Sequence, residues 1–283
     1  MTDTSAPLKT SIARAHTGLV PSLRRIYALV FRHVYLLRSS GPRILELVYW
    51  PTVQMVLWGF ITVFLVGHSS WVAQASGVLL SGVLLWDVLF RSQLGVSLVF
   101  MEEMWSRNLG HLFVSPLRPY ELACALLTMS LIRTLIGVGG AALIAIPLFH
   151  YSIFSIGLPL LVFFMNLIVM GWSIGLLVSG IVLRYGLGAE SMAWVAIFAV
   201  QPISGVYYPI STLPTWLQHV AAILPSSYVF EGMRSVLFDH VLRMDLLFSA
   251  VGLNIIYLSA GFLSFVMFFN MARVRGQLLH VGE

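Results

Sequence analysis

The sequence predicts an all-α, polytopic membrane protein with six transmembrane helices. Of its 283 residues, 59% are hydrophobic and 10% are charged, whereas soluble domains average about 45–50% apolar and about 25% charged residues. The apolar residues form long runs of helix-spanning length rather than short alternating segments, which favours helices over a β-barrel. The net charge of +5 comes from basic residues that flank these runs, so it indicates orientation in a membrane rather than binding of nucleic acid.

Residues 1–18 are expected to form a disordered cytoplasmic leader. They contain no apolar core and no cleavage site of small residues, so a secretory signal is not indicated. Their composition, rich in Ser, Thr and Arg, weakly resembles a transit peptide, but a basic leader is the simpler interpretation.

A single transmembrane domain is predicted over residues 19–275, beginning with an amphipathic helix over residues 19–40. Apolar side chains recur at helical spacing from Leu23 to Leu37, and arginines flank them. A basic amphipathic helix directly before a span is expected to lie in the membrane interface. Residues 276–283 are expected to form a cytoplasmic tail.

Six apolar runs are long enough to be expected to cross a bilayer. The fifth is the shortest and runs into the segment VYYPISTLP. No internal repeat is apparent, which weakens the case for a transporter built from inverted repeats. The six expected spans are Ile44–Val66, Gly77–Phe100, Leu122–Phe149, Ile156–Leu183, Met192–Tyr207 and Leu246–Met271.

The basic residues predict the orientation of these spans. With six spans, twelve lysines and arginines fall on the side of the termini and two on the opposite side. Since cytoplasmic segments carry the excess of basic residues, both termini are expected to be cytoplasmic. We therefore expect a multi-pass protein of the bacterial cytoplasmic (inner) membrane.

Residues 101–113 are predicted to form a short amphipathic helix on the cytoplasmic side. Glu102 and Glu103 lie in its expected first turn, where the helix dipole favours acids, and Glu103 is spaced to pair with Arg107. Pro116 and Pro119 are expected to end it. On the residues alone, this helix either merely joins two spans or docks a soluble partner.

Two blocks of sequence resemble type-2 ABC transporter permeases. The first is EEMWSRNLGHLFVSPLRPYEL, in which Asn108-Leu109 replaces the usual Gly-Thr of the family's loop. The residues that follow the family's order are Glu103, Arg107, Gly110, Leu112, Ser115, Pro116, Leu117 and Glu121. The second block, PISGVYYPISTLPTWLQHVAAILPSSYVFEGMRSVLF, resembles the family's segment before the last span.

The second block predicts an outer re-entrant hairpin over residues 205–234, made of two short helices broken at Pro214 and Pro225. Backbone of this kind must be covered by protein or line a cavity. Glu231 and Arg234 are spaced as an i,i+3 pair. The candidate outer-gate residues are Tyr207, Tyr208, Trp216, Tyr228, Glu231 and Arg234, and the four aromatic residues are equally consistent with an interfacial belt.

The resemblance implies the permease subunit of an ATP-driven exporter that pairs with a second copy of itself and with a separate ABC ATPase. It implies ATPase-coupling roles for Glu102, Glu103, Trp105, Arg107, Gly110, His111 and Pro116. Independently, the single lysine, Lys9, follows no glycine-rich loop, so no P-loop is present and the chain is not expected to be an enzyme. ATP and Mg²⁺ are expected in the partner subunit, with no cofactor bound by this chain.

Charged residues within the spans are the candidates for a translocation pathway, because such charges are costly in a bilayer. Asp87 and Arg91 are four residues apart, so a self-neutralising structural pair is the alternative interpretation. For Arg133, contact with Asp87, exposure to a cavity and binding of an anionic head group all stay open. The charge-poor, aromatic and Met-rich spans favour a hydrophobic or amphipathic substrate, such as a drug, a lipid or a lipid-linked saccharide, in contact with membrane lipid.

Two other functions are each suggested by one feature of the sequence. An ion-coupled secondary transporter would use Asp87, the one clear carboxylate candidate within the spans. A hydrolase is disfavoured because GWSIG at residues 171–175 lies within a span and the histidines lie outside the spans or at their edges; Gly171, Gly175 and Ser179 instead form a small-residue face for helix packing. The single cysteine, Cys124, gives no basis for a metal site.

Overall fold

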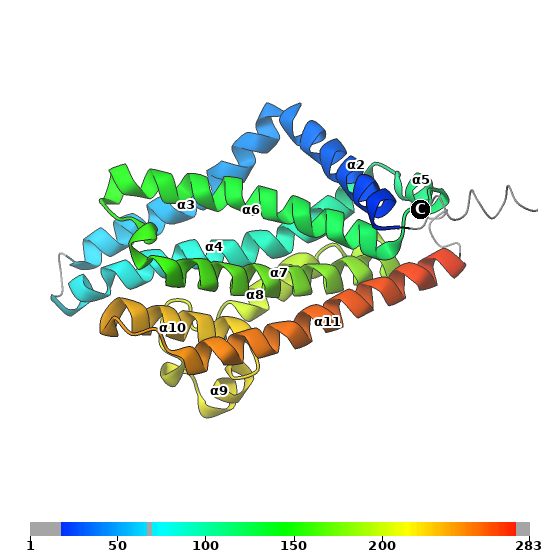
Figure 1. Cartoon of the computed structure of the whole chain (residues 1–283). Helices are drawn as coiled ribbons and strands as arrows, with labels where there is room; N and C mark the ends of the chain where they lie inside the picture. Colours follow the sequence, from blue (N-terminus) through cyan, green and yellow to red (C-terminus); the bar gives the residue numbers. More distant parts are fainter. Residues whose placement is uncertain (1–17, 67–69, 276–283) are drawn as a thin grey trace, which may run out of the picture.

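The structure is a computed structural model that describes residues 18–66 and 70–275, and the expected leader (1–18) and tail (276–283) lie almost entirely outside this range. The described residues form helices and connecting turns (Figure 1). The α-helices are α2 (Leu19–Arg38), α3 (Gly41–Val66), α4 (Ser70–Trp105), α5 (Leu109–Val114), α6 (Pro119–Phe149), α7 (Leu158–Tyr185), α8 (Met192–Val200), α9 (Thr215–Ala221), α10 (Pro225–Asp239) and α11 (Met244–Arg275). Three short 3₁₀ turns are η1 (Ile153–Ile156), η2 (Leu187–Ala189) and η3 (Ile210–Thr212).

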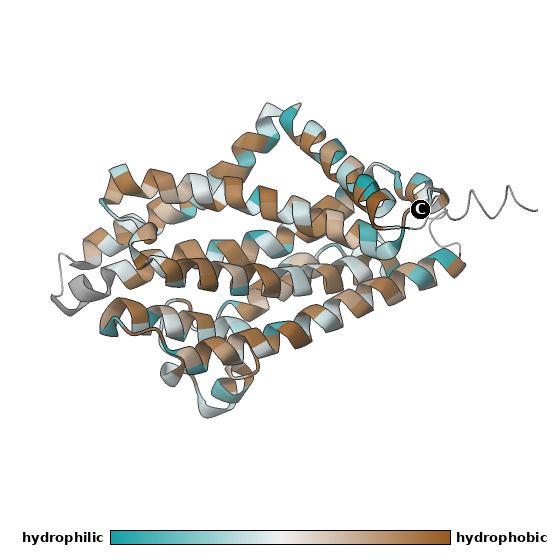
Figure 2. Ribbon diagram, in the orientation of Figure 1, coloured by the Kyte–Doolittle hydropathy of each residue, from teal (hydrophilic) through white to brown (hydrophobic). Residues whose placement is uncertain are grey.

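Five of these helices, α3, α4, α6, α7 and α11, are long and apolar enough to cross a membrane. They run side by side, and α5 and the end of α11 lie at the same end of the bundle (Figure 1). Apolar residues cover the long helices, whereas polar residues gather where α2 and α5 lie (Figure 2). The all-α prediction is confirmed for the described residues, and five of the six expected spans correspond to these helices.

The fifth expected span, over residues 192–207, is not confirmed. Its helix, α8, has nine residues, which extend about 14 Å and cannot cross a hydrocarbon core of about 30 Å. Pro202 lacks the amide proton that would continue the helix, and Gly205 has a φ of 65°. The residues after α8 therefore form turns, and their course brings the carbonyl oxygen of Val206 close to Gly82 of α4.

Helices α4 and α7 form the centre of the bundle through the predicted small-residue face. A Cβ atom at Gly171 would lie 1.9 Å from Ser92 Oγ, and one at Gly175 would lie 2.7 Å from Val96 Cβ. The hydroxyl of Ser173, between them, donates to the carbonyl oxygen of Val169. The small residues thus allow α7 to approach α4 within one chain, as the predicted face for helix packing requires.

The predicted helix over residues 19–40 corresponds to α2. Its buried side chains are Ser22, Leu29, His33 and Leu37, and it packs against the start of α6. Leu23 and Tyr27, which belong to the predicted apolar stripe, are instead exposed. Ile26, Val30, Val34 and Leu37 of the same stripe pack on the core, so one edge of the stripe faces the protein and the other edge is exposed; its location in the membrane interface stays a prediction.

The single helix predicted over residues 101–113 is wrong. Helix α4 continues to Trp105, and the separate helix α5 begins at Leu109. Between them Arg107 has a φ of 54°, a left-handed conformation that ends a helix. The predicted Glu103–Arg107 pair is wrong for the same reason, since Arg107 lies beyond the helix end.

The hairpin predicted before the last span is built as its prolines indicate. Pro214 is the residue directly before α9, and Pro225 is the first residue of α10. Both helices, of seven and fifteen residues, are shorter than a span. Their re-entry into the membrane stays a prediction.

Candidate functional site

The loop between α4 and α6 is attached to α2 through buried Glu103. Arg32 Nη1 donates to Glu103 Oε1 at 2.7 Å, and Asn108 Nδ2 donates to Oε2. His33 Nε2 lies 2.8 Å from Oε1, within ion-pair distance but not aligned for a hydrogen bond. Glu103 therefore faces α2 and cannot itself contact a soluble partner, contrary to the expected docking role.

A second buried acid, Glu121 in the first turn of α6, makes an equivalent attachment. Its carboxylate accepts hydrogen bonds from Ser22 Oγ at 2.7 Å, from Arg25 Nη2 at 2.6 Å and from the backbone amide of Arg118 at 3.0 Å. This carboxylate raises the pKa of Arg25 above its usual value. We call the contacts of Glu103 and Glu121 with α2 the α2 clamp; it holds both ends of the loop.

Between these attachments the loop presents an exposed surface. Trp105 is 50% exposed and Val114 is 89% exposed. Arg107, His111 and Pro116 are also exposed, and Gly110 is half-buried. Leu109 and Leu112 are buried beneath them. We call Trp105, Arg107, His111 and Val114 the exposed loop surface. Buried leucines attach it to the protein, and its own side chains are accessible to solvent.

Glu102, the other acid expected to take part in coupling, forms an ion pair with Arg133 of α6. Arg133 Nη2 donates to both carboxylate oxygens of Glu102 at 3.0 Å. The partner of Arg133 that the sequence left open is therefore Glu102, thirty-one residues away. Helix α4 has 36 residues, or about 54 Å of helix, which is longer than a hydrocarbon core of about 30 Å.

A cavity of about 480 Å³ adjoins this ion pair, and both Glu102 and Arg133 line it. Helices α2, α3, α4, α6 and α8 line it, together with Tyr207. All three pathway candidates predicted from the sequence, Asp87, Arg91 and Arg133, line this one cavity. The cavity therefore joins charged side chains of α4 and α6 to the aromatic residues of α8.

Asp87 and Arg91 do not form the direct ion pair that their spacing allows. Neither belongs to an ion pair shorter than 4.0 Å among the described residues. Asp87 Oδ2 and Arg91 Nε are buried without a hydrogen-bond partner. Both residues instead line the same cavity, and the choice between a pathway role and a structural role stays a prediction.

A model of the ABC-2 type transporter family matches residues 40–238. The chain belongs to this family. The match runs from the start of α3 to α10 and so contains the loop, both acids of the α2 clamp and every cavity-lining residue except Leu37. Helix α2 and helix α11 lie outside it. No curated protein matches the chain.

The outer-gate candidates of this ABC-2 chain occupy different environments. Arg234 Nη2 donates to Glu231 Oε1 at 3.0 Å and its Nη1 to the carbonyl oxygen of Gly205 at 2.7 Å. The backbone amide of Ile210 donates to the same Glu231 oxygen at 2.8 Å. The predicted i,i+3 pair is thus present, and it fixes the turn after α8 to α10.

The four aromatic candidates are divided by the fold. Tyr207 stacks on Trp58 of α3 with ring centroids 4.4 Å apart and lines the cavity. Tyr208 and Tyr228 donate their hydroxyls to nearby backbone carbonyls, and Trp216 is exposed. Of these four residues, Tyr207 is the one that lines the cavity.

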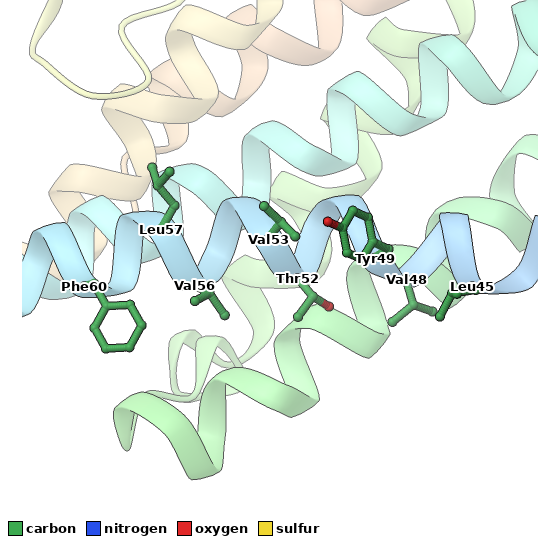
Figure 3. A pocket seen from close by; sticks show the side chains of 8 residues that line it. All are labelled: Leu45, Val48, Tyr49, Thr52, Val53, Val56, Leu57 and Phe60. Carbon is green, nitrogen blue, oxygen red and sulfur yellow. The ribbon is translucent and has the colours of Figure 1, made fainter.

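Sequence reasoning missed the clamp residues of α2, namely Ser22, Arg25, Arg32 and His33. Arg25 and Arg32 are seven residues apart, a spacing that places them on one helix face. This spacing is the signal that could have indicated a shared contact, but it does not identify the acids that Arg25 and Arg32 bind. A second hollow was also missed: an open groove on α3 lined by apolar residues and Thr52 (Figure 3). Its lining contains no charged residue.

Proposed function

We propose that this chain is the membrane-spanning permease subunit of an ATP-driven exporter that moves an amphipathic or hydrophobic substrate outward. Permeases of the ABC-2 type generally work with a separate ATPase subunit. The observation that carries the proposal is the Glu102–Arg133 pair, because it connects the end of α4, beside the exposed loop surface, with the wall of the cavity. Membership in the family supports the transport role.

In this proposal the ATPase binds the exposed loop surface and holds the ATP and Mg²⁺. Its closure on ATP moves the end of α4 together with α5. The α2 clamp passes this movement to α2 and α6, since Glu103 and Glu121 attach the loop to α2 at both ends. The bundle then alternates between two arrangements of the cavity, and the difference between these arrangements is what couples the two sites.

The proposed setting is a bacterial cytoplasmic membrane with both termini on the cytoplasmic side, surrounded by lipid. Five crossings would place the termini on opposite sides, so the segment from η2 to η3 completes a sixth crossing inside the protein. The course of this segment supports a sixth crossing. The Trp194 ring lies 6.0 Å from that of Phe90, and Val206 lies beside Gly82, which is eight residues before Phe90 in α4. A second copy of the chain is proposed from the family alone.

Co-purification tests the ATPase contact. The tagged permease is co-expressed with a candidate ABC ATPase, and the ATPase retained on the tag is measured for the native chain, Val114→Glu and Val274→Glu. Val114 is 89% exposed on α5 and Val274 is 87% exposed near the end of α11, so neither change disturbs the core. We expect Val114→Glu to lose about tenfold or more of the retained ATPase and Val274→Glu to retain it; equal retention by both variants would contradict the proposed contact.

An ion-coupled secondary transporter is the second candidate. It is favoured by the buried, unpartnered Oδ2 of Asp87 in the cavity. Vesicles that contain the permease without an ATPase separate the two candidates. Substrate accumulation driven by an ion gradient and abolished in Asp87→Asn would favour the secondary transporter, whereas dependence on ATP and its hydrolysis favours the exporter.

A further inference from the structure

The charged wall of the cavity is balanced in sign. Three carboxylates, from Glu46, Asp87 and Glu102, and three guanidinium groups, from Arg43, Arg91 and Arg133, line it. The cavity volume, about 480 Å³, lies within the range of small-ligand sites. A site with this lining offers hydrogen-bond donors and acceptors, and charges of both signs, to one occupant.

Three of these charged groups have buried atoms without a hydrogen-bond partner. They are Asp87 Oδ2, Arg91 Nε and Arg133 Nε. Asp87 is 5% exposed and Arg133 is 7% exposed, and the pair with Glu102 uses only Nη2 of Arg133. Buried polar groups in folded proteins are normally hydrogen-bonded. All three residues line the cavity, so one acceptor and two donors without partners lie in its wall.

Aromatic rings form another part of the wall. Trp86 and Phe90 of α4 and Trp194 and Phe198 of α8 line the cavity. The Trp194 and Phe198 rings stack with centroids 6.3 Å apart, and Phe90 lies about 6 Å from both. Aromatic faces, those of tryptophan above all, attract organic cations. Helix α4 therefore contributes a carboxylate (Asp87), an arginine (Arg91) and part of the aromatic surface to the same cavity.

We propose that this cavity binds the zwitterionic head group of a phospholipid, with the phosphate at Arg91 and Arg133 and the ammonium at Asp87. A purely anionic head group would leave Asp87 unpaired, and a purely cationic one would leave both arginine Nε groups unpaired. Asp87 and Arg91 are one helical turn apart, about 5–6 Å, so a single head group reaches both. The cavity holds the head group, and the acyl chains extend into the bilayer.

This inference names the substrate class of the proposed exporter and rests on it in that respect, but binding itself requires no ATPase. The purified full chain in a mild non-ionic detergent is equilibrated with an equimolar mixture of three lipids that have the same acyl chains. The lipids are phosphatidylethanolamine, anionic phosphatidylglycerol and a cationic trimethylammonium-propane lipid. Native mass spectrometry measures which lipid stays bound.

We expect the zwitterionic lipid to be retained about tenfold over each of the other two. Asp87→Asn is expected to reduce its preference over the anionic lipid to within about twofold, and Arg91→Gln its preference over the cationic lipid. Asp245→Asn, which changes the exposed pair with Arg243, is the matched control and should behave as the native chain. Equal retention of the three lipids, or preferences unchanged in both cavity variants, would overturn the proposal.

Two further arms separate the possible results. Water-soluble phosphorylethanolamine at the lipid's concentration should not displace it; displacement would overturn the assignment to a lipid. Transport is then measured with the ATPase in vesicles. Selective binding without ATP-driven transport would leave the site standing and reject the exporter, whereas ATP-driven transport without head-group selectivity would reject the lipid class and leave the exporter standing.

Discussion

Arg133 on α6 donates to both carboxylate oxygens of Glu102 on α4 at 3.0 Å. Glu102 lies three residues before the exposed Trp105, and Arg133 lies in the wall of the cavity. This ion pair therefore links the end of α4 that leads into the loop with the part of α6 that lines the cavity. Its contribution can be measured by removing each charge in turn.

Glu102→Gln and Arg133→Gln are each expected to weaken the coupling of ATP hydrolysis to transport, because they remove the ionic part of this link. Coupling energies between protein sites are about 1–3 kcal/mol, or about 5–150-fold. We expect the number of substrate molecules transported per ATP hydrolysed, measured in vesicles with the ATPase, to decrease by a factor within this range. The double charge swap, Glu102→Arg with Arg133→Glu, should recover part of the loss; a swap no better than either single change would argue against the link.

Loss of the α2 clamp is expected to destabilise the protein. In Glu121→Ala, Ser22, Arg25 and the amide of Arg118 all lose their buried acceptor. Removing the acceptor of a buried donor costs about 1–3 kcal/mol, and the lower part of the range is expected because Arg25 is partly exposed. The midpoint of thermal unfolding in detergent should fall by several degrees. Arg243→Gln, in the exposed pair with Asp245, should change it little, since such pairs contribute about 0–1 kcal/mol.

The close approach of α7 to α4 predicts opposite outcomes for two glycine substitutions. Gly171→Ala should destabilise by about 1–3 kcal/mol, because its Cβ would meet Ser92 Oγ and the Leu89 carbonyl oxygen at 2.8 Å. Gly139→Ala in α6 has nothing within 4 Å of the new Cβ, so the better helix propensity of alanine should leave stability unchanged or slightly raised. Thermal unfolding of the two variants side by side checks this, and an equal response would show that the packing is looser than described.

Orientation in the membrane can be tested with single cysteines in a Cys124→Ser background. Ser106→Cys, in the loop after α4, should react with a membrane-impermeant maleimide only in inverted vesicles. Ser211→Cys, in η3, should react in intact cells, because both positions are exposed and the proposed topology places them on opposite sides. Labelling of Ser106→Cys from outside the cell would reverse the topology and remove the exposed loop surface from the reach of an ATPase.

The main features of the fold followed from the sequence, but the exact helix ends depended on local details. Sequence reasoning found five spans, the helix breaks at Pro214 and Pro225, and the Glu231–Arg234 pair. Each of these features is encoded by residues that are close together in the chain. The helix expected over 101–113 failed because Arg107 adopts a left-handed conformation that hydrophobic spacing does not encode. The fifth expected span is not confirmed as one helix, because α8 ends at Val200 while the apolar composition continues through Pro202 and Gly205.

The sequence by itself determined that the chain is a bundle of apolar helices and which charged residues stand out in it. Only the tertiary structure decided the partners of those charges: Glu102 with Arg133, Glu103 with Arg32, and Glu121 with Arg25. The reason is that helical periodicity depends on neighbours three or four residues away. These ion pairs join residues 31 to 96 positions apart, and such partners meet only when whole helices pack.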